Sequence, residues 1–175
     1  MMKFIRFFKW IIYTAGFLLV SVFEFTPHMI PPIDHAAPLL LIPLLICTSM
    51  FEGETAGAMF GVLAGLIWDT QGGKVFGFDA LFLLIFGLCA GLLVEYLFRN
   101  TIVSALIFTL SFTFLLEVLT WFFFRSLFGI NNFVYSLLHV ILPTSLYTLV
   151  FTVPFYYCVR ALSGRFKKKE AREHE

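Results

Sequence analysis

The sequence predicts an all-α protein, a polytopic transmembrane helical bundle of six helices. Of its 175 residues, 60% are hydrophobic, above the roughly 45–50% that is usual in soluble domains. Only 13% are charged, against about 25% in soluble domains. The mean hydropathy is +0.93, and 24 phenylalanines are more than a soluble core of this size could bury. The apolar residues also fall into six long segments, which is the pattern of repeated membrane crossings.

The six segments are expected to form helices in chain order. They are Phe4–Phe25, Pro31–Phe51, Gly53–Thr70, Phe78–Phe98, Thr101–Phe124 and Phe133–Val159. The first stays as a helix and is no cleavable signal peptide, because it is long and aromatic and no small-x-small site follows it. Pro143 and Pro154 interrupt the last segment, where each removes a backbone hydrogen bond and favours a kink.

The second and third segments are marginal for a full crossing, since prolines and glycines break them. They could instead form a re-entrant hairpin. Glu52 and Glu54 stand at the tip of that hairpin, and two carboxylates in the middle of a membrane are costly. The sequence therefore favours two full crossings, with the turn in water.

Lysine and arginine predict the orientation of the bundle. Six crossings place both termini on one side, and of the 12 Lys and Arg only Lys74 and Arg125 fall on the other. Since cytoplasmic loops carry the excess of these residues, both termini are expected in the cytoplasm. We divide the chain into a transmembrane domain, 1–162, and a basic cytoplasmic tail, 163–175. Basic clusters in this position bind anionic lipid or simply fix the orientation, and the tail offers Arg165, Lys167, Lys168 and Lys169.

Glycines recur every four residues in the third segment and again in the fourth. Residues four apart share one face of a helix, and a face of glycines lets another backbone approach closely. These positions predict a helix-packing or partner interface. Either the third and fourth helices pack on each other, or part of the face admits a helix of a partner. The positions are Gly53, Gly57, Gly61, Gly65, Gly87 and Gly91.

Asp69, Gly77 and Asp79 mark the connection between these two helices. Asp79 falls in the first turn of the fourth helix, where a carboxylate suits the positive end of the helix dipole. Asp69 ends the third helix, which is the unfavourable end for an anion, so it needs a partner such as Lys74 or a backbone amide. No phosphate-binding loop is indicated, because the GxxxxGK pattern does not occur.

Glu117 and His139 are ionisable residues placed inside predicted membrane helices. Such residues are functional candidates, and a Glu with a His could relay protons. The alternative is a hydrogen bond between helices that fixes their packing. The sequence has no Ser-His-Asp arrangement, no HExxH motif and no paired acids, and its three cysteines lack the spacing of a zinc site. We therefore expect no enzyme activity, no cofactor, no metal and no nucleic-acid partner.

Two stretches of the sequence contain residue patterns that indicate a protein family. The first runs through Gly57, Gly61, Gly65, Trp68 and Asp69 to Gly77-Phe78-Asp79-Ala80-Leu81 and the glycines at 87 and 91. The second is Pro143-Thr144-Ser145-Leu146-Tyr147-Thr148 with Pro154 and Arg160. Together they resemble the rod shape-determining protein MreD family over nearly the whole chain. The excess of phenylalanine departs from the family's leucine-rich pattern.

The resemblance implies a multi-pass component of the bacterial inner membrane that takes part in cell elongation. It implies a scaffold that binds MreC and, with it, links a peptidoglycan transpeptidase and polymerase to MreB filaments. It also implies a fold like that of the substrate-binding subunits of energy-coupling-factor vitamin transporters. Two other functions stay open: a vitamin-binding transporter subunit, disfavoured because the first helix offers only Ala15 and Gly16 as small docking residues, and a proton-coupled carrier using Glu117 and His139.

Overall fold

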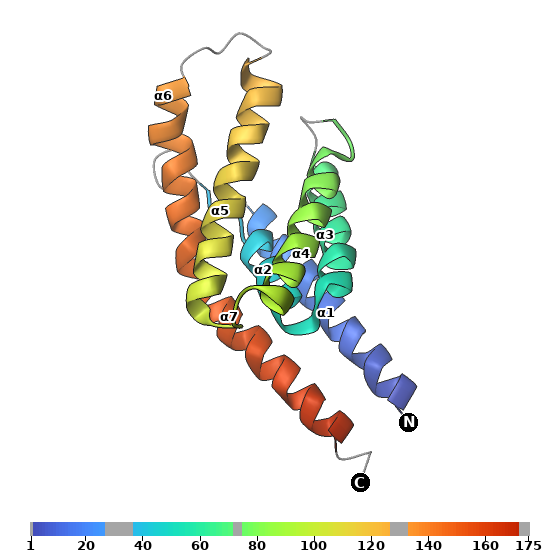
Figure 1. The fold of residues 1–175 in the computed structure, drawn as a ribbon. Helices are drawn as coiled ribbons and strands as arrows, with labels where there is room; N and C mark the ends of the chain where they lie inside the picture. The colour runs from blue at the N-terminus through green and yellow to red at the C-terminus, as the bar shows by residue number, and fades with distance from the viewer. Residues whose placement is uncertain (1, 27–36, 72–74, 127–132, 172–175) are drawn as a thin grey trace.

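The computed structural model describes residues 2–26, 37–71, 75–126 and 133–171, and these form helices and short connections without any strand. Figure 1 shows the helices as a bundle, with the two termini at the same end. The elements are α1 (Met2–Phe25), α2 (Leu41–Glu52), α3 (Glu54–Asp69), α4 (Phe78–Tyr96), α5 (Ile102–Thr120) with the π-helical η1 (Trp121–Ser126), and α6 (Phe133–Ser136) with the π-helical η2 (Leu137–Ile141) and α7 (Leu142–Ala171).

Four of these stretches are long and apolar enough to cross a membrane: Phe7–Phe25, Phe78–Tyr96, Ile102–Phe124 and Phe133–Phe166. Helices α2 and α3 have only 12 and 16 residues, below the roughly 20 that span a bilayer core. The crossing of the membrane by both of them therefore stays a prediction. The second helix begins only at Leu41, and residues 37–40 approach it in a non-helical conformation.

The non-helical approach to α2 runs through the interior and is stabilised by side chains. The Leu39 amide donates to Thr148 Oγ1 of α7 at 3.0 Å. The Leu41 amide donates to Glu24 Oε2 of α1 at 3.1 Å. Irregular backbone at membrane depth is stable only where protein groups satisfy its amides, and these two bonds meet that need.

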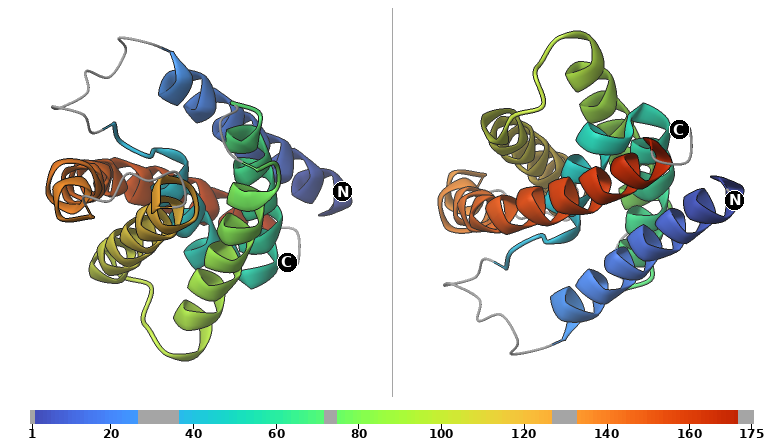
Figure 2. Two further views of the ribbon diagram at one scale, coloured as in Figure 1. Left: turned by 90° about the horizontal axis from the view of Figure 1, so that it is seen from above. Right: turned by 90° about the horizontal axis from the view of Figure 1, so that it is seen from below.

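Helix α2 is the centre of the bundle. Its residues from Leu41 to Met50 are all buried, and it contacts α3, α4, α5 and α7. Figure 2 shows it enclosed by these longer helices. At its lower end, Gly53 joins it to α3 with a φ of 93°, a left-handed backbone that glycine adopts without a steric cost.

Helix α1 packs against this centre along one stripe. Lys9, Tyr13 and Phe17 on that stripe are buried. The ring of Phe60 on α3 stacks on Phe17 at 4.8 Å and on Trp10 at 5.6 Å between ring centroids. The opposite face of α1 is exposed, so this helix contributes one side to the core and one to its surroundings.

The last helix contains the two prolines singled out above. Pro143 follows the π-helical turn η2, and Pro154 lies inside α7, which runs on to Ala171. The hydroxyls of Ser145 and Thr148 donate to the carbonyls four residues earlier, both at 2.7 Å. Helix α7 thus continues past the predicted domain boundary at residue 162, and the division there stays a prediction. Lys74 and the side chains of Arg125 and Lys167–Lys169 lie outside the described part of the chain.

Candidate functional site

The glycine face of α3 is occupied by α4. A Cβ added to Gly57 or Gly61 would come within 3 Å of the α4 backbone at Gly87 or Leu83. A Cβ added to Gly65 would meet the backbone of Ala80 in the same way. Real Cβ atoms essentially never come this close to other heavy atoms, so the two backbones are in direct contact. We call this contact the α3–α4 seam, formed by Gly57, Gly61 and Gly65 with Gly87 and Gly91.

The α4 side of the seam also presents glycines, at Gly87 and Gly91. A Cβ on Gly87 would approach the carbonyl oxygen of Gly57, and one on Gly91 would lie 2.5 Å from the Cα of Glu54. The five seam glycines are all buried. The hypothesis that part of this face admits a partner helix is therefore wrong for the seam, because α4 fills it along its length.

Gly53 has a different role from the other glycines in the predicted ladder. Its positive φ ends α2, and its amide donates to the Ser49 carbonyl at 2.9 Å. A Cβ there would meet nothing within 4 Å. Its requirement for glycine is conformational. Its backbone also borders α4, because a Cβ added to Gly91 would lie 2.9 Å from the Gly53 carbonyl carbon, and its place in the predicted interface stays a prediction.

Asp69 caps the helix that follows its own. One carboxylate oxygen accepts from the amides of Gly77 at 2.9 Å and Ala80 at 3.2 Å, and the other accepts from Asp79 at 3.1 Å. Gly77, at the N-cap position with a φ of 94°, has no side chain to do this. The carboxylate thus lies at the positive end of the α4 dipole, where an anion is stabilised. Of the two partners suggested for Asp69, the backbone amide is the one that the structure shows.

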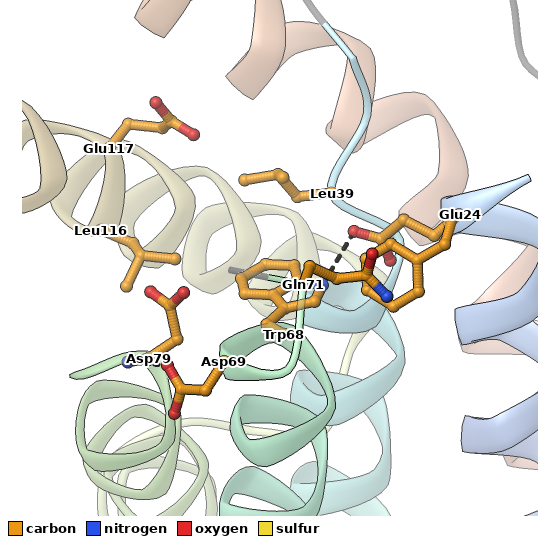
Figure 3. A pocket seen from close by; sticks show the side chains of 9 residues that line it. Glu24, Leu39, Trp68, Asp69, Gln71, Asp79, Leu116 and Glu117 are labelled. Carbon is orange, nitrogen blue, oxygen red and sulfur yellow. Dashed lines mark hydrogen bonds between the residues drawn. The ribbon is translucent and has the colours of Figure 1, made fainter. Parts of the chain in front are cut away.

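A polar cavity of about 220 Å³ lies beside this cap (Figure 3). Four carboxylates line it, from Glu24, Asp69, Asp79 and Glu117, together with Trp68. Glu24 accepts a hydrogen bond from the Trp68 indole at 3.0 Å and from the Leu41 amide described above. The cavity therefore lies between the end of α1, the end of α3, the beginning of α4 and one face of α5.

Glu117 and His139 have different surroundings. Glu117 contributes to the wall of the polar cavity, opposite Glu24 in Figure 3. His139 is exposed on η2, with its ring stacked on Tyr135 at 4.4 Å and its Nδ1 3.2 Å from the Tyr135 carbonyl oxygen. The structure therefore gives His139 a local partner on its own helix.

A second polar cluster ties α1 to the end of α2. Lys9 forms an ion pair with Glu52, and these side chains are only 10% and 5% exposed. The Tyr13 hydroxyl donates to the other oxygen of Glu52 at 2.9 Å. The expectation that Glu52 stands in water at a turn is wrong, because Lys9 and Tyr13 provide its partners inside the protein. Sequence reasoning missed Lys9, Tyr13, Glu24 and Trp68 as structural partners.

The polar groups of these two sites hold helices together. Their carboxylates accept hydrogen bonds from amides, an indole, a phenol and an ammonium group. No group of three His, Cys, Asp or Glu that could hold a metal occurs within the described ranges. On α7, Arg165 is exposed on the helical continuation beyond residue 162.

Fold and site together define a helical membrane protein whose bundle is built around a glycine seam and two buried carboxylate clusters. Residues 3–166 match the family model described as rod shape-determining protein MreD. The chain belongs to the MreD family, a family of rod shape determination. Comparison with curated proteins and with solved structures gave no match, so the expected likeness to energy-coupling-factor subunits stays a prediction.

Proposed function

We propose that this protein is a non-catalytic scaffold of the bacterial cell-elongation machinery. It binds MreC in the inner membrane and helps couple the transpeptidase and polymerase of peptidoglycan synthesis to MreB filaments. Both of its termini lie in the cytoplasm. The proposal is supported by membership of the MreD family and by one surface that suits a partner helix.

That surface is the outer face of α1, since the glycine seam is occupied. A shallow hollow of about 390 Å³ lies there, lined by Phe7, Trp10, Ile11, Thr14, Ala15 and Leu18. Small residues between large ones let a second membrane helix approach closely and interlock. The Thr14 hydroxyl donates to the Trp10 carbonyl at 2.9 Å, so a partner helix would meet no unsatisfied donor from this side chain.

The occupant that we propose is the single membrane anchor of MreC. In a bilayer, helices gain little by hiding apolar surface, because lipid tails solvate it as well. Shape therefore decides where a partner helix binds. The hollow at Ala15 offers that shape, and a large side chain there would remove it.

The test is the variant Ala15→Trp, made in the full chain and co-expressed with MreC. Ala15 is exposed, so the indole fills the hollow without entering the core. Met59→Trp is the matched control, because Met59 is 68% exposed on α3 and lies outside the hollow. We expect MreC recovery to fall at least about tenfold for Ala15→Trp, a loss of about 1.4 kcal/mol, and to be unchanged for Met59→Trp.

Rod shape in a depletion strain is the second readout. We expect Ala15→Trp to give rounded cells at normal protein levels and Met59→Trp to restore rods. Full recovery of MreC with Ala15→Trp would refute the docking surface. Transpeptidase and polymerase recovery should follow MreC in both variants, and their independence from MreC would refute the proposed order of assembly.

The size of the polar cavity bears on the vitamin-binding alternative. Sites for drug-sized molecules usually enclose roughly 300–1,000 Å³, and this cavity encloses about 220 Å³. Its walls are also joined to one another by the Glu24 and Asp69 hydrogen bonds. These features favour a structural role for the cavity over the binding of a vitamin.

A further inference from the structure

The lower part of α7 carries a feature that the scaffold function does not explain. The continuous helix Phe133–Phe166 has 34 residues, whereas about 20 cross a bilayer core. At 1.5 Å per residue, the helix is therefore about 20 Å longer than a crossing requires. Figure 1 shows this end of α7 projecting past α2, α3, α4 and α5.

One side of this projection is attached to the bundle. Tyr156, Val159 and Ser163 are buried there. The Tyr156 hydroxyl donates to the Asn100 carbonyl at 3.3 Å, and its ring lies 5.3 Å from that of Phe51. These contacts fix the rotation of the helix, so its other side is held outward.

The outward side changes from apolar to cationic along its length. Leu146, Val150 and Val153 are exposed, and Tyr157 follows with 56% of its surface exposed. Arg160 and Arg165 come next, both exposed. Aromatic residues with a polar tip favour the membrane interface, so the change falls where the hydrocarbon gives way to headgroups.

A hollow of about 540 Å³ lies at this change, lined by Tyr157, Arg160, Ala161, Gly164 and Arg165. Gly164 has no side chain, and a Cβ added there would meet nothing within 4 Å. The surface of the hollow is mostly apolar, and Arg160 and Arg165 are the two charged residues of its lining. Guanidinium binds phosphate oxygens through paired hydrogen bonds.

We infer that this hollow is a binding site for the headgroup of an anionic phospholipid, whose phosphate lies between Arg160 and Arg165 and whose acyl chain lies along Val153, Val150 and Leu146. The apolar stripe that leads into the hollow favours a lipid over a soluble phosphate or an acidic protein segment. This inference is independent of the proposed binding of MreC.

The experiment is native mass spectrometry of the full-length protein with phosphatidylglycerol, and with phosphatidylcholine of the same acyl chains as the neutral control. We expect one phosphatidylglycerol to be retained preferentially. Because each basic residue near the surface contributes about 1 kcal/mol, Arg160→Gln or Arg165→Gln should weaken retention about fivefold, and the double variant about 25-fold. The water-soluble glycerophosphoglycerol should not displace the lipid.

Two further variants separate a defined site from overall charge. Gly164→Leu fills the hollow and keeps every charge, so it should abolish the preference for phosphatidylglycerol. Arg99→Gln removes an exposed arginine that does not line the hollow, and should leave the preference unchanged. Retention unaffected by Gly164→Leu, or an equal loss with Arg99→Gln, would overturn the inference. Displacement by glycerophosphoglycerol or by an acidic peptide would equally overturn it.

Discussion

Gly57 and Gly87 face each other across the α3–α4 seam so closely that a Cβ on either would meet the carbonyl oxygen of the other. The contact is reciprocal, and it continues at Gly61 and Gly65. Neither backbone can move away without opening the seam. The first prediction follows from this geometry.

Gly61→Leu should destabilise the protein by about 3 kcal/mol or more, the upper part of the range for overpacking, because the added side chain meets the backbone of Leu83 and Leu84. The measurement is the thermal unfolding of the purified protein in detergent. Gly16→Leu is the control, since a Cβ on Gly16 meets nothing within 4 Å, and its unfolding temperature should stay near that of the parent. A Gly61→Leu protein as stable as the parent would show that the seam is not closed.

Asp69→Ala should lower the stability by about 1–3 kcal/mol, the cost of a lost cap and of unsatisfied donors. Three amides lose their acceptor, at Gly77, Asp79 and Ala80. Hydrogen exchange at these amides should therefore become faster, while Asp69→Asn, which keeps one acceptor oxygen, should fall between. Gln71→Ala is the control, because Gln71 is exposed nearby. Unchanged exchange at residues 77–80 in Asp69→Ala would contradict the cap.

Glu52→Gln should destabilise the bundle by about 3–5 kcal/mol, because Lys9 then keeps a buried charge with no anionic partner. Glutamine can still accept from Tyr13, so the change isolates the ion pair. Adding Lys9→Met should recover most of the loss, since a buried pair often contributes little beyond an apolar replacement. Thermal unfolding of the two single variants and the double variant gives the coupling energy. Strictly additive losses would show that Lys9 and Glu52 do not interact.

Glu117→Gln and His139→Ala should both restore rod shape in a depletion strain. A scaffold needs neither proton transfer nor a charge at these positions, and His139 contacts its own helix through Tyr135. The measurement is the ratio of cell length to width, with Ala15→Trp as the inactive comparison. Round cells from a stably inserted Glu117→Gln protein would restore the proton-carrier hypothesis.

Composition and periodicity were enough to predict the helical class and the number of helical stretches, and the resemblance of two motifs to a known family predicted the family. The seam glycines were also visible, because glycines four residues apart mark a close helix contact. The sequence left two occupants open, the fourth helix or a partner helix, and the structure shows the fourth helix. The contact depends on the register that sets Gly57 against Gly87, and that register is a property of the folded pair.

The carboxylate clusters were beyond sequence reasoning for a related reason. Glu52 and Tyr13 are 39 residues apart, and Glu24 and Trp68 are 44 apart. No local pattern connects such pairs, so the partners of Glu24 and Glu52 could not be inferred from the sequence. The length of α2 was partly visible, because Pro31, Pro32 and Pro38 interrupt the segment before it. The bonds to Glu24 and Thr148 that stabilise the irregular approach were not visible, because they are tertiary.

The burial of α2 on every side has a consequence for how the protein is made. This helix has only 12 residues, and α7, the neighbour with which it makes the most contacts, comes later in the chain than its other neighbours. Until α7 is made, Leu41–Met50 lacks the contacts that α7 provides. The enclosure of α2 is therefore complete only once α7 has been made.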